Sequence, residues 1–411
     1  MNAERAALQR RTLRVLFVAQ TLSGVGLAAG IAVGALLAQQ MLGSTGSSGL
    51  PTALFTLGSA AAAVLVGRIS QSFGRRPGLA TGYAVGAVGG ALVVTAAAID
   101  NVPLLFASLV LYGSGTATNL QARYAGGDLA EPSERARAIS AVLVATTVGA
   151  VLGPNLGEPT GELARTLGIP HLAGPFLLAA AAYAAAALAV VILLRPDPLL
   201  SARRLDLVAA AAGQAPDDQH AAVDAARLRV AAAGMVITQL IMVAIMTMTP
   251  IHMRDHGHGL AASGAVISIH VAAMFLPSPL SGRLVDRFGP TRMFIVAGFT
   301  LLGAGVVAAL APADSVALLA VGLALLGLGW SFGLVSGTAM VTDAVPLAER
   351  ARTQGTVDLF IALAGATGGL GSGFVVAAGS FTALALGGGV LALAMIPIVL
   401  TARRRPLVAV A

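Results

Sequence analysis

The sequence predicts an all-α membrane protein whose twelve transmembrane helices form two six-helix bundles. Three observations lead to this prediction: the composition, the number of long apolar stretches and an internal repeat. Hydrophobic residues make up 57% of the 411 residues and charged residues 10%, whereas about a quarter of a soluble domain is charged. The 50 glycines also suit a membrane protein, because membrane helices associate by close backbone approach at small residues.

The apolar stretches supply the helices. A helix that crosses the hydrocarbon core needs about 20 apolar residues, and twelve stretches meet this requirement. They cover residues 13–41, 51–69, 77–99, 104–126, 138–156, 172–194, 230–251, 260–280, 293–310, 316–340, 353–376 and 381–400. The first is long enough to tilt or to project beyond the bilayer, and it has no small-residue cleavage site of a signal peptide.

The chain repeats itself at one offset, 282 − 67 = 215 residues. Three pairs match at this spacing: residues 67–74 (GRISQSFG) with 282–289 (GRLVDRFG), residues 134–137 (ERAR) with 349–352, and Asp128 with Asp343. The chain therefore consists of two copies of one membrane unit in the same order, a parallel duplication that is typical of transporters.

The repeat predicts the domain organisation. We expect an N-terminal bundle at residues 1–195, a cytoplasmic linker at 196–229 and a C-terminal bundle at 230–411. The linker mixes Ala-rich and charged stretches with a polar run at 214–220. It is expected to be a tether with one surface helix, or a binding site for a regulator.

The positive charge is distributed as in a membrane protein rather than a nucleic-acid-binding protein. The net charge is +7 and all 25 basic residues are arginine. With the N-terminus inside, only Arg165 and Arg254 fall in predicted outer segments, a strong positive-inside bias. The sequence therefore predicts a cell (inner) membrane protein with both termini in the cytoplasm.

Missing residue types exclude several activities. Without lysine there is neither a Walker A phosphate loop nor a pyridoxal-phosphate Schiff base. Without cysteine there is no thiol catalysis, disulfide or thiolate metal site. We find no nucleophile–base constellation, so neither an enzyme nor a cofactor is predicted. His252, His256 and His258 lie in one short loop, but such loops are usually solvated, and no metal site is expected there.

The repeated loop resembles the G-x-L-x-D-R-x-G-R motif of the major facilitator superfamily, and the resemblance covers essentially the whole chain. The motif positions are Gly67, Gln71, Gly74 and Arg75 in the first copy and Gly282, Asp286, Arg287 and Gly289 in the second. Gln71 stands where the family has an acid. The resemblance implies a monomer whose two bundles flank a central cavity lined by the first, fourth, seventh and tenth helices, with transport by alternating access.

An acid in this loop can face the positive N-terminus of a helix in the opposite half. Asp286 is expected to face the start of the fifth helix near Ala138, and Gln71 the start of the eleventh near Thr353. Such contacts hold the cytoplasmic side shut. Gln71 can still form hydrogen bonds but lacks the charge contribution of roughly 0.3–1 kcal/mol, so Asp286 is expected to carry more of the closure.

The fifth helix resembles the G-x-x-x-G-P-x-x-G pattern of the 12-helix drug/proton antiporters of the superfamily. Gly149, Gly153 and Gly157 are expected on one smooth face, kinked by Pro154, that packs against the other half. This pattern favours export, with multidrug resistance as the corresponding role. The fourth helix departs from the antiporters, since their R-x-x-Q-G-x-G is replaced around Tyr112 and lacks the arginine and the glutamine.

Candidate substrate contacts come from polar, aromatic and methionine residues inside the spans. A stripe in the seventh helix includes Met235, Met242 and Met246, and it indicates a broad, apolar specificity if it faces the cavity, or plain packing otherwise. The candidates are Gln20, Tyr112, Asn119, Gln239, Met242, Met246 and Trp330.

Candidate proton-coupling residues are Asp358, Arg123 and Glu158. An acid inside a span is costly and marks a functional site by default. The alternative for Asp358 is a structural ion pair at the inner mouth, and Arg123 could instead extend to the cytoplasmic surface.

These observations predict a secondary active transporter that exports small apolar or amphipathic compounds in exchange for protons. The alternatives are nutrient uptake, by facilitated diffusion or proton symport, and a membrane sensor that does not transport. The expected partners are a small-molecule substrate, protons and the lipid bilayer, without nucleic acid.

Overall fold

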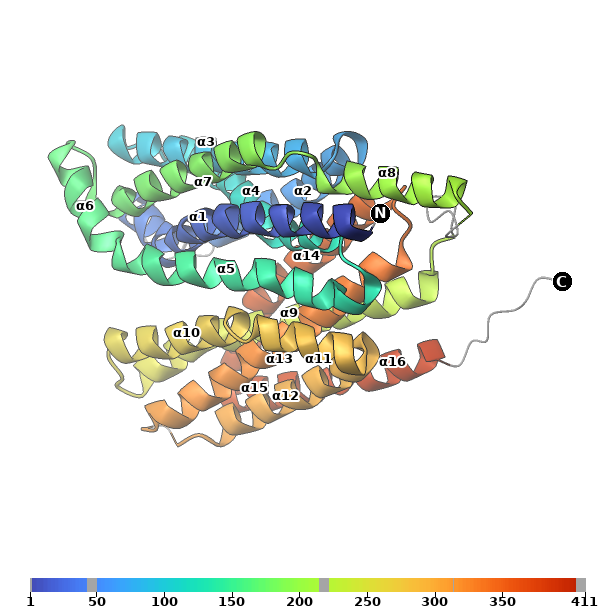
Figure 1. Ribbon diagram of the computed structural model, residues 1–411. Coiled ribbons are helices and arrows are strands. Elements are labelled where there is room, and N and C mark those ends of the chain that lie inside the picture. Colours follow the sequence, from blue (N-terminus) through green and yellow to red (C-terminus); the bar gives the residue numbers. More distant parts are fainter. Residues whose placement is uncertain (1, 43–49, 214–221, 313, 404–411) are drawn as a thin grey trace. The chain divides into compact units, whose positions relative to one another are not determined.

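A computed structural model describes residues 2–42, 50–213, 222–312 and 314–403 (Figure 1). Throughout these ranges the regular elements are helices, which confirms the predicted all-α class. In the first half the predicted spans are α1 (Asn2–Leu42), α2 (Leu50–Phe73), α3 (Arg75–Ala98), α4 (Val102–Gly127), α5 (Arg135–Asn155) and α7 (Gly174–Leu193). Three short elements were not predicted, namely η1 (Pro132–Glu134), α6 (Gly157–Thr166) and η2 (His171–Ala173).

The second half contains the counterparts of these spans. They are α9 (Ala225–Asp255), α10 (Leu260–Phe275) with α11 (Ser278–Phe288), α12 (Pro290–Leu310), α13 (Val316–Ala344), α14 (Arg350–Ala378), and α15 (Phe381–Ala392) with α16 (Met395–Arg403). The eighth span is divided between α10 and α11 because Pro277 and Pro279 lack the amide hydrogens that a continuous helix needs. Nine segments of the described chain are helical, long and apolar enough to cross a membrane.

The chain divides into two compact units. Unit 1 comprises Met1–Glu131, Ala141–Ala221 and Pro346–Leu363, and unit 2 comprises Pro132–Ser140, Ala222–Val345 and Ala364–Ala411. The start of α5 thus clusters with the second half of the chain, and the first part of α14 clusters with the first half. This exchange of helix ends places parts of both repeats in each unit.

The core of unit 1 surrounds α4. An aromatic cluster fills its centre, where the Tyr112 ring lies 5.3 Å from that of Phe176 and 5.6 Å from that of Tyr183. A side chain at Gly115 would collide with the Tyr183 ring, so the glycine lets α4 and α7 pack closely. The Tyr112 hydroxyl donates to the carbonyl oxygen of Gly26, which satisfies a polar group that would otherwise be buried without a partner in this core.

The core of unit 2 surrounds α13, whose buried residues include Leu319, Leu323 and Leu326. The ring of Phe294, from α12, would collide with any side chain at Gly234 of α9, and Met235 of α9 would collide with any side chain at Gly337 of α13. Small residues again determine how closely the helices approach, as expected where lipid removes the hydrophobic drive for association.

The predicted surface helix of the linker exists as α8 (Pro198–Ala211), and it is docked rather than free. Its buried face contributes Leu199 and Leu205 to a cluster with Leu347. Arg203 donates to the carbonyl oxygens of Gln71 and Leu347, each at 3.1 Å. The helix therefore fastens the loop after α2 to the segment before α14, within unit 1. The polar run 214–220 lies outside the described residues.

Candidate functional site

In unit 2, the second loop motif (residues 282–289) caps the start of α5. The Asp286 carboxylate accepts hydrogen bonds from the backbone N–H groups of Ala136 and Arg137, both at 3.0 Å. The contact falls one to two residues before the expected Ala138, because α5 begins at Arg135. A side chain at Gly282 would collide with Ser140, so this glycine permits the close crossing of α11 and α5.

In unit 1, the first loop motif (residues 67–75) caps the start of α14. The Gln71 Oε1 atom accepts from the N–H groups of Ala351 at 2.8 Å and Arg352 at 3.3 Å. Its amide also donates to the carbonyl oxygens of Leu347 and Ala348. An aspartate could not make the donor contacts, so the amide replaces the missing charge with two further hydrogen bonds. Gln71 thus forms more hydrogen bonds to the start of its helix than Asp286 does. The sequence had suggested that Gln71 would make the weaker contact of the two.

We expect Asp286→Asn to loosen the start of α5, because the amide keeps one acceptor oxygen but turns its NH2 group towards the other backbone N–H. Losing the helix-end charge and one hydrogen bond costs about 1–2 kcal/mol, which corresponds to a roughly 5- to 30-fold larger opened fraction. The measurement is the rate of thiol labelling at Ser140→Cys, which is buried beneath the crossing. The chain has no other cysteine.

The matched control for this experiment is Asp314→Asn, an exposed aspartate of the same unit. It should leave the labelling of the Ser140 position unchanged. Equal labelling rates with and without Asp286→Asn would contradict the capping role.

Arg75, the last residue of the first motif, forms a second network in unit 1. Its guanidinium binds both carboxylate oxygens of Asp128, with Nε–Oδ2 at 2.7 Å and Nη2–Oδ1 at 3.1 Å. It also donates to the Oε1 atom of Gln354. Both charged side chains are buried, at 1% and 0% exposure. The sequence showed Asp128 as a repeated position but did not indicate its partner.

The corresponding aspartate of the second half uses other arginines. Pro290 stands where Arg75 has its counterpart, and Asp343 instead pairs with Arg135 and, at 2.8 Å, with Arg227. The repeated carboxylate is thus neutralised in both copies, but by arginines from different positions.

A third charged cluster joins α4 to α14 in unit 1. Arg123 and Asp358 form a salt bridge with Nη2–Oδ1 at 2.6 Å and side chains 0% and 3% exposed. The Tyr124 hydroxyl lies 3.2 Å from the same carboxylate oxygen and accepts from Arg123 at 2.9 Å. Arg123 therefore does not extend to the surface, and two of the three coupling candidates meet. Tyr124 was missed, although its position beside Arg123 was a possible signal.

The third coupling candidate, Glu158, lies elsewhere. It is on α6 and its side chain is 76% exposed, so it lacks the burial shared by Arg123 and Asp358.

The polar substrate candidates of unit 1 form a buried network around Gln20. Its amide donates to the Asn119 carbonyl oxygen at 3.0 Å and to the Thr146 hydroxyl at 3.2 Å. Its Oε1 atom accepts from the Tyr83 hydroxyl at 2.7 Å. The Asn119 side chain donates to Ser23 at 2.7 Å. Gln20 is fully buried, so in this arrangement its bonds stabilise the bundle. Tyr112 is likewise enclosed in the aromatic core.

In unit 2, Gln239 and Trp330 come together. The Trp330 indole donates to the Gln239 Oε1 atom at 2.8 Å, which links α9 to α13. The predicted methionine stripe divides, because Met235 packs against Gly337 whereas Met246 is only half-buried. Met242 is buried.

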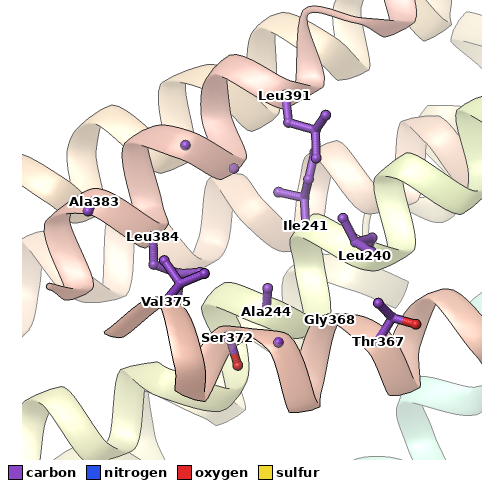
Figure 2. A pocket seen from close by; sticks show the side chains of 13 residues that line it. Leu240, Ile241, Ala244, Thr367, Gly368, Ser372, Val375, Ala383, Leu384 and Leu391 are labelled. Atoms are coloured by element: carbon purple, nitrogen blue, oxygen red, sulfur yellow. The ribbon is translucent and has the colours of Figure 1, made fainter. Parts of the chain in front are cut away.

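A pocket of about 300 Å³ lies in unit 2 between α9, α14 and α15. Figure 2 shows its lining, in which Thr367 and Ser372 carry the only polar side chains. Ser372 donates to the Gly369 carbonyl oxygen at 2.8 Å, so its hydroxyl is engaged within its own helix. Much of the hollow exists because glycines line it, among them Gly371 and Gly387, where an added Cβ would meet nothing within 4 Å. The site suits an apolar group.

The fifth-helix motif does not form the predicted face. Gly149 packs against α1, where a Cβ at the facing Gly24 would lie 2.7 Å from the Thr146 carbonyl oxygen. The helix ends at Asn155, so Gly157 belongs to α6. Gly149 and Gly157 therefore do not share one helix face as expected, and packing of the motif against the other half stays a prediction. The side chains of Gly153 and Pro154 lie outside the part of the chain that the structure describes.

Two bundles of apolar helices related by a parallel repeat, with charged networks buried inside, define a multi-pass membrane transport protein rather than an enzyme. The chain belongs to the Major Facilitator Superfamily, whose model matches residues 16–276 and 230–410. It is therefore a secondary transporter with the twelve-helix fold of that family.

Relatives and solved structures agree with this assignment. The chain is 54% identical to the uncharacterized MFS-type transporter YdeG of Bacillus subtilis (strain 168), over 97% of this chain and 93% of the relative. It is 32% identical to the riboflavin transporter RfnT of Brucella anthropi, over 87% and 86% of the two chains. The human organic anion transporter MFSD10 (TETRAN) has the same fold, with a TM-score of 0.77, 17% identity and coverage of 95% and 99%.

Proposed function

We propose that this protein is a proton-coupled transporter of small amphipathic organic compounds, and that Asp358 is its proton-binding group. The observation that carries the proposal is the buried Arg123–Asp358 pair. Ionisable residues inside membrane spans are costly and mark ion pathways. A proton that binds Asp358 removes the charge that Arg123 neutralises, so protonation and rearrangement of this contact are linked.

The position of Asp358 on α14 gives this linkage a structural consequence. The segment up to Leu363 clusters with unit 1, whereas α14 from Ala364 onward belongs to unit 2. Protonation of Asp358 weakens the attachment of the first part of α14 to α4. A single protonation event thus acts on a helix that continues from one unit into the next, as coupling in an alternating-access transporter requires.

The substrate class follows from unit 2. The apolar pocket is at the lower end of the roughly 300–1,000 Å³ typical of small-molecule sites. The Gln239–Trp330 pair, which lies outside the residues that line the pocket, places a polar group and a largely buried indole on neighbouring helices. This combination supports a compound with an apolar body and a few polar atoms.

For the direction of transport, export against inward-moving protons is the first candidate; it rests on the sequence resemblance of residues 149–157 to the antiporter pattern, although Gly157 lies on α6 rather than on α5. Uptake is the second candidate, and a flavin-like substrate is favoured by the 32% identity to a riboflavin transporter. Riboflavin has the flat, amphipathic character that the site supports. The arginine distribution supports a position in the cell membrane with both termini in the cytoplasm.

The deciding experiment uses purified protein in liposomes with an imposed pH gradient of either sign. Riboflavin and a panel of lipophilic cations serve as test compounds. Accumulation against the direction of proton flow indicates export, and accumulation with it indicates uptake. If a compound is transported at the same rate with and without the pH gradient, proton coupling is contradicted.

We expect Gly387→Leu to reduce transport of the bulkier compounds several-fold more than that of the smaller ones. The new side chain enters the open space of the pocket, where no atom lies within 4 Å of a Cβ. The measurement is the relative initial rate across the panel. Gly303→Leu is the matched control, since it is a helix-interior glycine of the same unit with equally free space but lies outside the pocket. Equal effects of the two substitutions on the relative transport rates would contradict a role of the pocket in substrate binding.

A further inference from the structure

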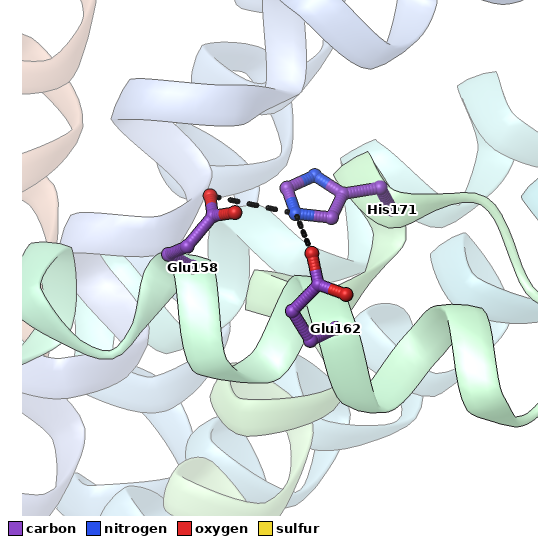
Figure 3. Close-up of side chains that lie close together, drawn as sticks. All are labelled: Glu158, Glu162 and His171. Carbon is purple, nitrogen blue, oxygen red and sulfur yellow. Dashed lines mark ion pairs between the residues drawn. The ribbon is translucent and has the colours of Figure 1, made fainter.

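A group of potential metal ligands lies at the end of unit 1 opposite to the N-terminus and α8 (Figure 1). Glu158 and Glu162 are four residues apart on α6 and so share one face of the helix. The chain then reverses and returns as η2, which begins at His171. Figure 3 shows both carboxylates directed towards the His171 ring. The three candidate ligand atoms lie within 4.8 Å of one another.

The separations in this group are those of shared coordination rather than hydrogen bonding. The His171 Nε2 atom lies 3.5 Å from Glu158 Oε2 and 3.8 Å from Glu162 Oε1. Both distances exceed the roughly 2.7–3.2 Å of an N–H···O hydrogen bond. Ligand atoms placed tetrahedrally around Zn²⁺ at about 2.0–2.2 Å are about 3.3–3.6 Å apart. Small side-chain rotations therefore suffice to hold one ion.

The surroundings of the His171 ring support a prepared site. The Nε2 atom is shielded from solvent and forms no hydrogen bond with the described residues, so the two carboxylates of the group are its polar neighbours, although the side chain as a whole is 26% exposed. The imidazole lies directly over Gly161, where any side chain would collide with it. Gly174, at the start of α7, is pressed equally closely against the Thr160 backbone. The ring is thus held in place between the two carboxylates by tightly packed backbone.

One neighbouring charge opposes a cation. Arg165, on the same helix, pairs with Glu162 Oε1 at 2.6 Å, but this pair is more than half exposed on both sides. An exposed pair contributes little, about 0–1 kcal/mol, so a metal ion can displace it.

We propose that Glu158, Glu162 and His171 form a binding site for a divalent transition-metal ion, with Zn²⁺ as the best match. One imidazole and two carboxylates suit zinc, whereas Mg²⁺ and Ca²⁺ take oxygen ligands. The exposed carboxylates leave a fourth position for water. The bound ion connects α6 to the start of η2 and stiffens the corner between α5 and α7. This site is independent of the proposed proton coupling and was not indicated by the sequence, which drew attention to the histidines of another loop.

The test is a titration of the chelator-treated, purified protein with Zn²⁺ by calorimetry, and with Co²⁺ by visible absorption. The wild type should bind one ion. His171→Ala and Glu158→Gln should each lower the affinity at least about tenfold. Arg165→Gln should raise it, because the competing guanidinium is gone. Glu158 and Arg165 have exposed side chains, so their variants are expected to fold normally, and size-exclusion chromatography verifies the fold of these variants and of His171→Ala.

The matched control is His256→Ala, which alters the histidine-containing loop after α9 and should leave zinc affinity unchanged. Two results would overturn the proposal: wild-type protein that binds no Zn²⁺ at millimolar concentration, or binding that His171→Ala leaves at the wild-type affinity. Loss of binding in His256→Ala with retention in His171→Ala would assign the ion to the other loop, and would equally overturn it.

Discussion

Asp358→Asn is expected to abolish accumulation driven by a pH gradient and to destabilise the protein. The amide cannot take up a proton, so the proposed coupling step is lost. It also leaves Arg123 buried without a counter-charge, and breaking one partner of a buried pair costs about 3–5 kcal/mol. Counterflow of labelled substrate without a gradient should continue in the folded fraction. The measurement compares gradient-driven accumulation with counterflow in the same liposomes.

Loss of coupling and loss of fold are separated by a double variant. Asp358→Asn combined with Arg123→Gln removes both charges, so no uncompensated charge remains and the folded yield should recover. Coupling should not recover. Asp100→Asn, at an exposed turn residue with φ of 51° that asparagine adopts equally well, is the control and should behave as the wild type. Gradient-driven accumulation by the double variant at the wild-type level would show that the proton binds elsewhere.

Arg75→Gln is expected to produce the largest loss of stability outside the membrane-buried pair. Asp128 would keep its charge at 0% exposure without its bidentate partner, and Gln354 would lose its donor. For a chain of 411 residues, the cost of about 3–5 kcal/mol corresponds to a melting temperature lower by about 4–6 °C. The measurement is thermal unfolding of the purified protein in detergent.

The neighbouring Arg76 provides the control for this prediction. Its backbone N–H binds Asp197 at 2.7 Å, a contact that Arg76→Gln retains, so that substitution should change stability by no more than about 0.5 kcal/mol. Adding Asp128→Asn to Arg75→Gln should restore part of the lost stability because no unpaired charge remains. A melting temperature of Arg75→Gln equal to that of Arg76→Gln would contradict the structural role of the network.

The sequence by itself determined the helical class, the repeat and the partners of the two loop motifs. Apolar length reports a membrane span directly, because the bilayer accepts only backbone that satisfies its own hydrogen bonds. The favourable interaction of an acid with a helix N-terminus then predicted that each loop motif faces the start of a helix from the other copy. The contacts of Asp286 and Gln71 lie within two residues of the predicted positions. Local sequence sufficed here because helix ends need caps wherever they occur.

Only the tertiary structure decided which charges pair. Arg123 and Asp358 are 235 residues apart, and Arg75 and Asp128 are 53 apart, so no periodicity connects them. The repeat was even misleading, since Arg75 corresponds to Pro290 and the two copies neutralise the same aspartate differently. The end of α5 at Asn155 and the return of His171 onto α6 also depend on how the chain packs. Two buried charges pair only when their helices are in contact and both residues lie at the same level along those helices. Both conditions depend on how the helices pack, so they cannot be read from the sequence.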